Sequence, residues 1–250
     1  MTAMAQATFR IWRGAEAGGS FTDYATEVSE GMVVLDAVHQ IQAESAGDLA
    51  VRWNCKAGKC GSCSAEVNGK PKLMCMTRLS DLDLGQPVVL EPVRAFPPVK
   101  DLVTDVSWNF RVKPKLHPFT PRPADAPDGT WRMQQEDVDR IQEFRKCIEC
   151  YLCQDVCHVL RDHRLFDGFI GPRFLVHVAA LEMHPLDTAD RREELRKEQG
   201  IGYCNITKCC TNVCPEGIKI TDNAIIPLKE RVVDRYYDPL LRLLRLVRGG

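Results

Sequence analysis

The sequence contains no run of the roughly 18 or more apolar residues that a membrane-spanning helix needs. Its first 14 residues, MTAMAQATFRIWRG, also lack the apolar core and the small-residue cleavage site of a secretory signal. We therefore expect a chain that is not exported and that reaches a membrane only through a partner.

The chain also lacks an excess of charge of either sign, because 33 Lys and Arg residues balance 34 Asp and Glu residues to a net charge of -1. Such a surface does not attract polyanions, so we expect no nucleic-acid partner. Nucleotide-binding signatures and acid-base constellations are missing too. We therefore expect no catalysis of substrate chemistry by the isolated chain.

What the chain has in abundance is cysteine. The 12 cysteines stand in three tight groups, and the stretch from Met76 to Lys146 contains none. A secreted disulfide framework usually spreads its cysteines across the fold, whereas metal sites gather them. The grouping predicts three metal sites.

The first group is CKAGKCGSC, followed by one more cysteine after eleven intervening residues. This spacing is the plant-type [2Fe-2S] pattern, and the lack of a histidine ligand argues against a Rieske centre. Gly58 and Gly61 allow the loop to wrap its N-H groups around sulfur. A four-cysteine zinc site is the alternative, but its usual pattern has two CxxC pairs and this group has one. The predicted ligands are Cys55, Cys60, Cys63 and Cys75.

The second group, CIECYLCQDVC, has the spacing of a bacterial ferredoxin, in which three cysteines hold one cubane and the fourth reaches a second cluster. The third group, CNITKCCTNVCP, keeps that register, but Thr207 stands where the second ligand belongs. By the crossover rule the ligands of a [4Fe-4S] cluster are Cys147, Cys150, Cys153 and Cys214. The remaining three, which suit a [3Fe-4S] cluster, are Cys157, Cys204 and Cys210.

Cys209 has no ligand role in this scheme. We interpret it as a small buried hydrophobic residue, because its neighbour Cys210 has the better register. The alternative that Cys209 completes a second [4Fe-4S] cluster stays open.

The N-terminal third predicts a small mixed sheet. Strands are expected at 8–12 and 24–28 around a glycine-rich turn through Gly14, Gly18 and Gly19, with an amphipathic helix over 32–41. Asn68-Gly69 predicts a type I′ hairpin between 64–67 and 70–73, and 88–90 is expected to be the last strand.

Nine of the 15 prolines stand between Pro87 and Pro127, which predicts connecting chain that lies extended over a surface, with a disordered linker as the alternative. Helices are expected from Gln135 and from Pro172, at 225–233, and at 190–198 with a solvated face. The end, PLLRLLRLVRGG, predicts a basic amphipathic helix that lies on a membrane, or else packs on its own domain.

With these motifs placed, the chain resembles the iron-sulfur subunit of the succinate:quinone oxidoreductase family, which comprises succinate dehydrogenase and fumarate reductase. The resemblance covers nearly the whole length and is carried by CKAGKCGSC with Cys75, CIECYLCQDVC, FIGPRFL and CNITKCCTNVCPEGI. It implies an α+β architecture: a plant-ferredoxin-like β-grasp domain over 1–105 and an α-helical bacterial-ferredoxin-like domain over 106–250, joined by the proline-rich connection at about 87–127.

The resemblance also implies a function in the tricarboxylic acid cycle and respiratory chain. A flavoprotein partner that carries FAD oxidises succinate or reduces fumarate, and this subunit conducts electrons to a quinone through [2Fe-2S], [4Fe-4S] and [3Fe-4S] clusters. Membrane anchor subunits are further partners, and the location implied is peripheral, at the cytoplasmic face of the bacterial cell membrane. The alternatives are the iron-sulfur subunit of another soluble flavin-dependent dehydrogenase, or a zinc-binding scaffold.

The sequence departs from the family near the last cluster. His158 follows Cys157 where the family usually has proline, no tryptophan follows, and Asn205 replaces a family histidine. The quinone contacts therefore cannot be transferred residue by residue. The candidates on the quinone side are His158, His163 and Asn205.

Overall fold

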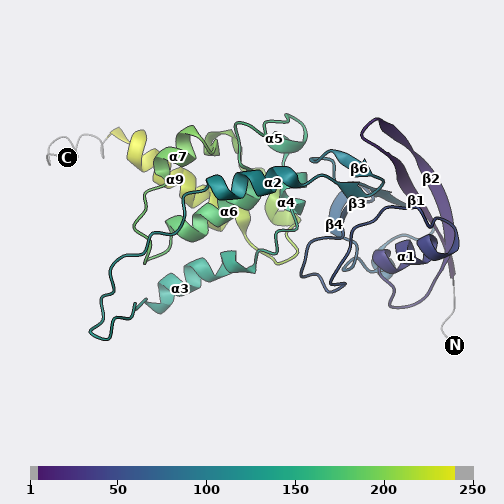
Figure 1. Cartoon of the computed structure of the whole chain (residues 1–250), viewed down its shortest axis with the longest axis horizontal. Coiled ribbons are helices and arrows are strands. Elements are labelled where there is room, and N and C mark those ends of the chain that lie inside the picture. The colour runs from purple at the N-terminus through teal and green to yellow at the C-terminus, as the bar shows by residue number, and fades with distance from the viewer. Residues whose placement is uncertain (1–4, 240–250) are drawn as a thin grey trace. The chain divides into compact units, whose positions relative to one another are not determined.

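The computed structural model describes residues 5–239 (Figure 1). The chain forms two compact units, one of residues 1–108 with 148–156 and the other of residues 109–147 with 157–250. A mixed sheet and a set of helices confirm the α+β class in this coarse sense. The predicted contiguous domain boundaries stay a prediction.

A five-stranded mixed sheet forms the framework of the first unit, with strand order β2-β1-β5-β3-β4. Its strands are β1 Ala5–Ala15, β2 Gly18–Val28, β3 Ser64–Val67, β4 Lys70–Leu73 and β5 Val88–Glu91. β1 pairs with β5 in parallel, and the other pairs are antiparallel. Alternate residues of β1, among them Phe9 and Ile11, are fully buried, as expected for a strand with one face in a core.

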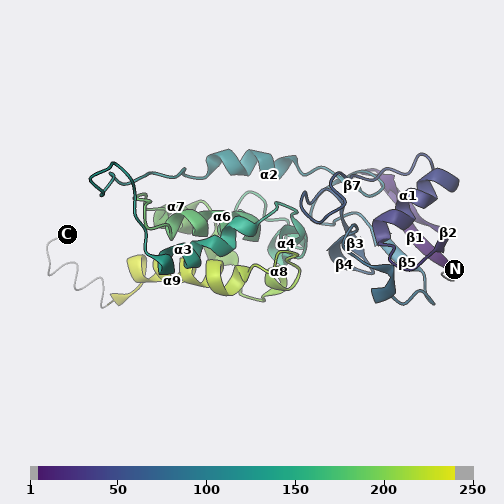
Figure 2. The same ribbon diagram turned by 90° about the horizontal axis from the view of Figure 1, so that it is seen from below.

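Helix α1, Val34–Glu44, lies beside this sheet in both ribbon views (Figures 1 and 2). It begins two residues later and ends three residues later than the predicted span. Leu35, Val38 and Ile41 recur on its buried face and are at most 1% exposed. The apolar spacing of the sequence therefore located the side of the helix that covers the core.

The two hairpins of the sheet had different outcomes. Asn68 and Gly69 join β3 to β4 with φ angles of 50° and 71°, which confirms the type I′ prediction. The turn predicted through Gly14, Gly18 and Gly19 is present but shorter than expected: Glu16 and Ala17 form it, and the three glycines lie within the paired strands. A Cβ atom on Gly19 would meet the Trp12 ring at 2.6 Å, so this glycine serves close packing between strands.

Strand β5, Val88–Glu91, confirms the strand predicted at 88–90, but it is not the last strand of the chain. Two short strands follow, β6 Pro98–Lys100 and β7 Val103–Thr104, which form a separate antiparallel pair. The turn between them presents Asp101, whose buried carboxylate accepts hydrogen bonds from the N-H groups of Gly14 at 3.0 Å and Ala50 at 2.8 Å. These contacts tie the proline-rich segment back to the sheet.

The second unit is helical. Apart from short 3-10 turns, its elements, together with α2 at the junction of the units, are α2 Ser107–Val112, α3 Gln135–Gln142, α5 His158–Arg161, α6 Gly171–Glu182, α7 Arg192–Lys197, α8 Cys209–Asn212, the π-helical turn Ile220–Ile225 and α9 Ile226–Tyr236. Helix α6 is the most buried of them, and Pro172 stands in its first turn as predicted. The helix expected at 225–233 continues to Tyr236. Within residues 5–239 no helix is long and apolar enough to cross a membrane.

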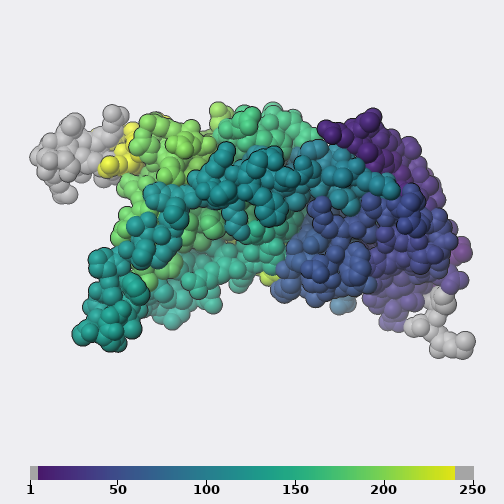
Figure 3. Space-filling model, in the orientation of Figure 1, coloured from purple at the N-terminus to yellow at the C-terminus, as the bar shows by residue number. Residues whose placement is uncertain are grey.

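Residues 109–127 of the proline-rich connection lie on the surface of the second unit (Figure 3). Its stretch around Thr120 is fixed, because Thr120 accepts a hydrogen bond from Thr188 N at 2.9 Å and Arg122 N donates to Leu186 O at 2.8 Å. The prediction of an extended chain on a surface is therefore confirmed around Thr120 and Arg122. The alternative of a disordered linker does not apply to these residues.

The solvated face predicted for 190–198 was wrong at Arg191, which is fully buried. Its guanidinium donates to the carbonyls of His117 at 3.0 Å and Pro118 at 2.6 Å and pairs with Asp187 at 2.8 Å. A buried arginine is tolerated where its donors are used in this way. The arginines of the predicted C-terminal helix, Arg242, Arg245 and Arg248, lie outside the described residues.

Residues 148–156 belong to the first unit through contacts with the loop of the first cysteine group. Ser64 Oγ lies 2.8 Å from Gly61 O and 2.9 Å from Cys150 O, so its proton is shared between two carbonyls. Asp155, which is also buried, accepts a hydrogen bond from Ala95 N at 2.9 Å. A Cβ atom on Gly61 would lie 2.5 Å from Cys150 Cα. Only glycine fits there.

Replacing Gly61 with alanine should therefore lower the stability of the first unit more than replacing Gly69. Both glycines have left-handed φ angles, 68° and 71°, which cost alanine about 1–2 kcal/mol. A Cβ atom on Gly69 meets nothing within 4 Å, whereas Gly61→Ala adds overpacking of about 1–3 kcal/mol against Cys150. The measurement is the urea midpoint of both variants, followed by circular dichroism. Equal midpoints would show that Cys150 moves away from the added methyl group without a loss of stability.

Candidate metal centres

The first cysteine group forms a loop that directs backbone N-H groups at sulfur. The N-H groups of Ala57 and Lys59 lie 3.4 and 3.3 Å from Cys55 Sγ, and Cys75 N lies 3.5 Å from Cys63 Sγ. Lys56 also has a left-handed φ of 53°, which helps to wrap the backbone. Donors around sulfur stabilise thiolates, so this donor set fits a cluster held by cysteine.

The thiols of this loop differ in their environments. Burial alone would raise the pKa of Cys60, but hydrogen bonds from Ser62 and Cys55 outweigh it and lower the pKa to about 6. Burial raises the pKa of Cys63 to about 12. Cys63 and Cys75 are buried while Cys55 is exposed, so the sulfur atoms of the proposed ligands range from the core to the surface.

The second and third cysteine groups have matching backbone conformations. In the second group, Glu149 and Tyr151 take left-handed φ angles of 56° and 61°. In the third, the residues at the same distances from the first cysteine, Ile206 and Lys208, have φ angles of 64° and 60°. Non-glycine residues in this conformation are uncommon and mark functional segments.

The match continues into the helices that follow. Helix α4, Leu152–Asp155, begins directly after Tyr151, and α8 begins directly after Lys208. In this alignment Thr207 takes the backbone position of Cys150. The sequence register is thus repeated in the backbone.

The units divide the ligands predicted for the [4Fe-4S] cluster. Cys150 and Cys153 belong to the first unit, whereas Cys147 and Cys214 belong to the second. Burial raises the pKa of Cys214, and the nearby Cys147 adds to this effect. This ligand set stays a prediction.

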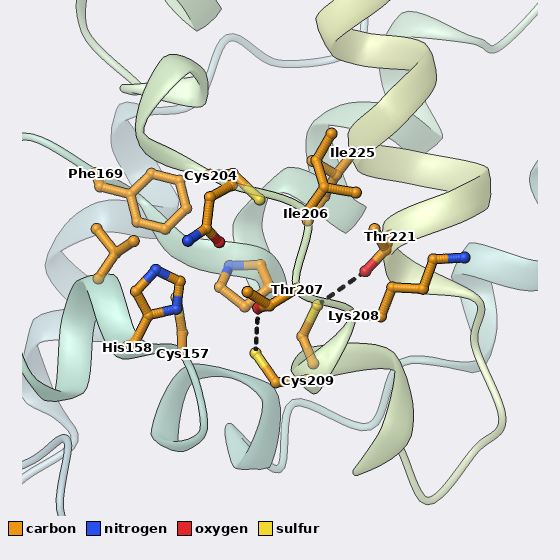
Figure 4. Close-up of a pocket in the computed structure, with 14 residues that line it drawn as sticks. Cys157, His158, Phe169, Cys204, Ile206, Thr207, Lys208, Cys209, Thr221 and Ile225 are labelled. Atoms are coloured by element: carbon orange, nitrogen blue, oxygen red, sulfur yellow. Dashed lines mark hydrogen bonds between the residues drawn. The ribbon is translucent and has the colours of Figure 1, made fainter.

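The predicted three-iron ligands line one pocket of the second unit (Figure 4). Its open space, part of which is bulk solvent, is about 320 Å³. Cys157 precedes α5, Cys204 lies in a loop and Cys210 lies in α8. The structure therefore brings Cys157 together with two thiols that follow it more than 40 positions later in the sequence.

Two of these three thiols are buried, and Cys204 is half-buried. Cys157 is 8% exposed and Cys210 is 6% exposed, and burial raises the pKa of each to about 11. Such thiols ionise readily only against a nearby positive charge, which iron supplies. The pocket thus fits an iron-sulfur cluster in its donor atoms and its burial.

Within residues 5–239 no three His, Cys, Asp or Glu side chains converge on a single metal ion. Cluster ligands do not need to converge in this way, because the thiolates of one cluster are shared among two or more iron atoms and inorganic sulfide lies between those atoms.

Two further residues shape this pocket and were missed by sequence reasoning. Thr221, buried at the start of the π-helical turn, places its Oγ1 3.4 Å from Cys210 Sγ. Lys229 of α9 donates hydrogen bonds to the carbonyls of Ile201 and Cys204 and so fixes the loop that carries Cys204. No local pattern in the sequence relates either residue to the pocket.

Cys209 is placed differently from the prediction. It is half-buried and lines the pocket, and its Sγ lies 3.2 Å from Thr207 Oγ1. The interpretation as a buried hydrophobic residue was wrong, because the first residue of α8 faces the pocket opening and Cys210 takes the interior.

Of the candidates on the quinone side, His158 and Asn205 line the same pocket. His163 is not among its lining residues, but its ring stands edge-on to that of His158 with centroids 6.1 Å apart. Their roles stay predictions.

Comparison with known families gives two matches. Residues 8–111 match the model of a 2Fe-2S iron-sulfur cluster binding domain, and residues 143–218 match that of a 4Fe-4S dicluster domain. These matches confirm the predicted [2Fe-2S] and [4Fe-4S] cluster types, and the [3Fe-4S] cluster stays a prediction. They do not name individual ligands.

Curated relatives match along most of the chain. The fumarate reductase iron-sulfur subunit of Mycobacterium tuberculosis is 34% identical over 81% of this chain and 82% of that protein. The succinate dehydrogenase iron-sulfur subunit of Paracoccus denitrificans is 30% identical over 82% of this chain and 78% of that protein. Other relatives are longer, and the chain spans 40% to 42% of their length.

A solved structure is similar throughout. A chain of the Mycobacterium smegmatis Sdh1 complex in the apo form is 60% identical and superposes with a TM-score of 0.91, covering 95% of this chain and all of that one. The fold, the two cluster-domain matches and these relatives agree, and the chain belongs to the family of iron-sulfur subunits of succinate dehydrogenase and fumarate reductase.

Proposed function

We propose that this chain transfers electrons between a flavoprotein subunit and a quinone in a membrane-associated succinate dehydrogenase or fumarate reductase. The observation that carries the proposal is the presence of three cysteine groups in one chain, with the third group built around a thiol-lined pocket. Relatives named for these two enzymes support it.

Each cysteine group has its own cluster in this proposal. The ligands of the [2Fe-2S] cluster are Cys55, Cys60, Cys63 and Cys75. Those of the [4Fe-4S] cluster are Cys147, Cys150, Cys153 and Cys214. Those of the [3Fe-4S] cluster are Cys157, Cys204 and Cys210.

The clusters supply one-electron chemistry when bound, and the residues of the chain set where it occurs. The N-H groups of Ala57 and Lys59 stabilise charge on the Cys55 sulfur. The burial of Cys157 and Cys210 excludes water from the last site. Hydrogen bonding and solvent exclusion are the means by which a protein tunes such potentials.

The partners in this proposal are a flavoprotein that carries FAD, one or more membrane anchor subunits, and a quinone, at the cytoplasmic face of the bacterial cell membrane. His158 and Asn205 face the last pocket and are the candidates for contact on the quinone side. The N-terminal domain is proposed to be a β-grasp domain within residues 1–105, and the rest a bacterial-ferredoxin-like domain.

Purification from membranes tests this function. The chain should copurify with a flavinylated large subunit and a membrane protein, and succinate should reduce its clusters, as seen by EPR. Copurification with a different soluble dehydrogenase, and no cluster reduction by succinate, would favour the alternative of another flavin-dependent enzyme.

With three irons in the last site, the purified complex should contain nine iron atoms per copy of this chain, two, four and three in the respective clusters. The measurement is iron and acid-labile sulfide against protein concentration. Zinc in place of iron would contradict the proposal.

The ligand sets predict different losses for two serine variants. Cys60→Ser should alter the EPR signal of the [2Fe-2S] centre alone, because its proposed ligands all come from one loop region and Cys75. Cys214→Ser should instead damage the [4Fe-4S] centre, although Cys214 follows the third group in sequence. Loss of the three-iron signal with an intact four-iron cluster in Cys214→Ser would contradict the crossover.

Thr207→Cys should convert the three-iron cluster into a four-iron cluster, because Thr207 takes the backbone position of Cys150. The EPR signal of the oxidised three-iron cluster should disappear and the potential should change, since cluster type and charge both set it. Quinone reduction should slow while flavin reduction by succinate persists. Thr207→Ser is the matched control and should keep the three-iron signal. An unchanged signal in fully assembled Thr207→Cys would show that position 207 does not face the open corner.

A further inference from the structure

We propose that Cys209 binds a fourth iron atom in the pocket of Figure 4, so that this site can hold either three or four irons. The inference rests on the proposed three-iron ligands Cys157, Cys204 and Cys210. It gives a role as an iron ligand to Cys209, the one cysteine that the proposed ligand sets do not use. The metal ion that Cys209 binds in this proposal is ferrous iron.

The first argument is the number of thiols around the cavity. Cys209 lines the same pocket as the three proposed ligands. Four cysteines are what a cubane requires.

The second argument is where the Cys209 thiol lies. Thr207 takes the backbone position of the missing ligand, and Cys209 Sγ lies 3.2 Å from Thr207 Oγ1. Figure 4 shows the two side chains pointing toward one another at the pocket. The sulfur atom of Cys209 therefore lies within hydrogen-bond distance of the position that the sulfur atom of a cysteine at position 207 would occupy.

The third argument comes from the matching run. The residue that corresponds to Cys209 is Leu152, the first residue of α4, and it is 1% exposed. Cys209 is half-buried, although it begins α8 in the same way. The position that holds a buried leucine in the second cysteine group thus holds an accessible thiol in the third group. The third group is the one in which a ligand is missing.

The contact between Cys209 and Thr207 explains why the fourth iron need not be permanent. Either atom can be the donor in this hydrogen bond, in which the Cys209 sulfur is bonded to Thr207 and not to iron. Rotation about the Cα–Cβ bond of Cys209 exchanges this contact for a bond to iron. The site therefore has a three-iron state and a four-iron state that differ by one side-chain rotation and one metal ion.

Iron uptake balances as follows. The oxidised three-iron core accepts one electron, which succinate supplies through the flavin in the proposed function. It then gains one Fe(II), and Cys209 releases its thiol proton to solvent as the sulfur–iron bond forms. One-electron oxidation with loss of Fe(II) and reprotonation of the thiol reverses the process.

The test uses the purified complex. Wild type, Cys209→Ser and Cys209→Ala are reduced without oxygen in the presence of ferrous iron enriched in the Mössbauer isotope, freed of excess iron, and reoxidised mildly. The readouts are the EPR signal of the oxidised three-iron cluster and the Mössbauer spectrum. The double variant Thr207→Cys/Cys209→Ser returns a thiolate to the corner and serves as the positive control.

Wild type should lose most of the three-iron signal and gain one labelled iron, while both single variants keep the signal. The alanine variant covers the case in which a serine oxygen binds iron. A three-iron signal that is absent from untreated wild type but present in Cys209→Ala also supports the proposal, because the fourth iron is then already bound.

The proposal is overturned if treated wild type keeps its three-iron signal, or if Cys209→Ala loses the signal as fully as wild type. Loss of the signal in the double variant then shows that the corner is open but that Cys209 does not face it. If no variant, Cys209→Ala included, shows a three-iron signal before treatment, the ligand assignment of the proposed function is what fails.

Discussion

The second unit buries thiol groups that ionise readily only in the presence of positive charge. Cys157 and Cys210 lie in its interior, and burial raises their pKa values to about 11. Without iron, this pocket is a cavity between short helical segments that have few hydrogen bonds of their own. With a cluster bound, the same sulfur atoms become links between the segments before α5, before α8 and within α8. Folding of this region and binding of the cluster are therefore one process in free energy terms.

The two ferredoxin-type runs show how a ligand can change while the backbone does not. Paired left-handed residues, Glu149 with Tyr151 and Ile206 with Lys208, shape both loops in the same way. Each such residue costs about 1–2 kcal/mol, which the surrounding contacts must offset. The conformation is thus retained at Thr207, where no thiolate is present. The difference in predicted cluster type comes from one side chain.

Much of the site and fold could be predicted from the sequence, because cysteine spacing and apolar periodicity are local properties. The hairpin at Asn68-Gly69, the helix with Leu35, Val38 and Ile41, and the helix at Pro172 all follow from such patterns. The pairing of the first two strands was underestimated, because Gly19 was assigned to a turn when it makes room for the Trp12 ring.

What could not be predicted depends on contacts between distant segments. The burial of Arg191, the contact of Thr221 with Cys210 and the hydrogen bonds from Lys229 each join residues that no local pattern relates. The exposure of Cys209 is of the same kind, since it depends on which side of α8 faces the pocket.

The way in which Arg191 fixes the proline-rich connection has a consequence for evolution. Two of its partners, at His117 and Pro118, are main-chain carbonyls, and every amino acid supplies that group. The path of the connection is therefore set in part by a residue more than 70 positions away, as the sequence separations of 74 and 73 show. A substitution at His117 loses the 3.1 Å contact of its ring with Glu194 but keeps the carbonyl that Arg191 binds. The surface there can thus change its chemistry to suit a new neighbour while keeping its shape.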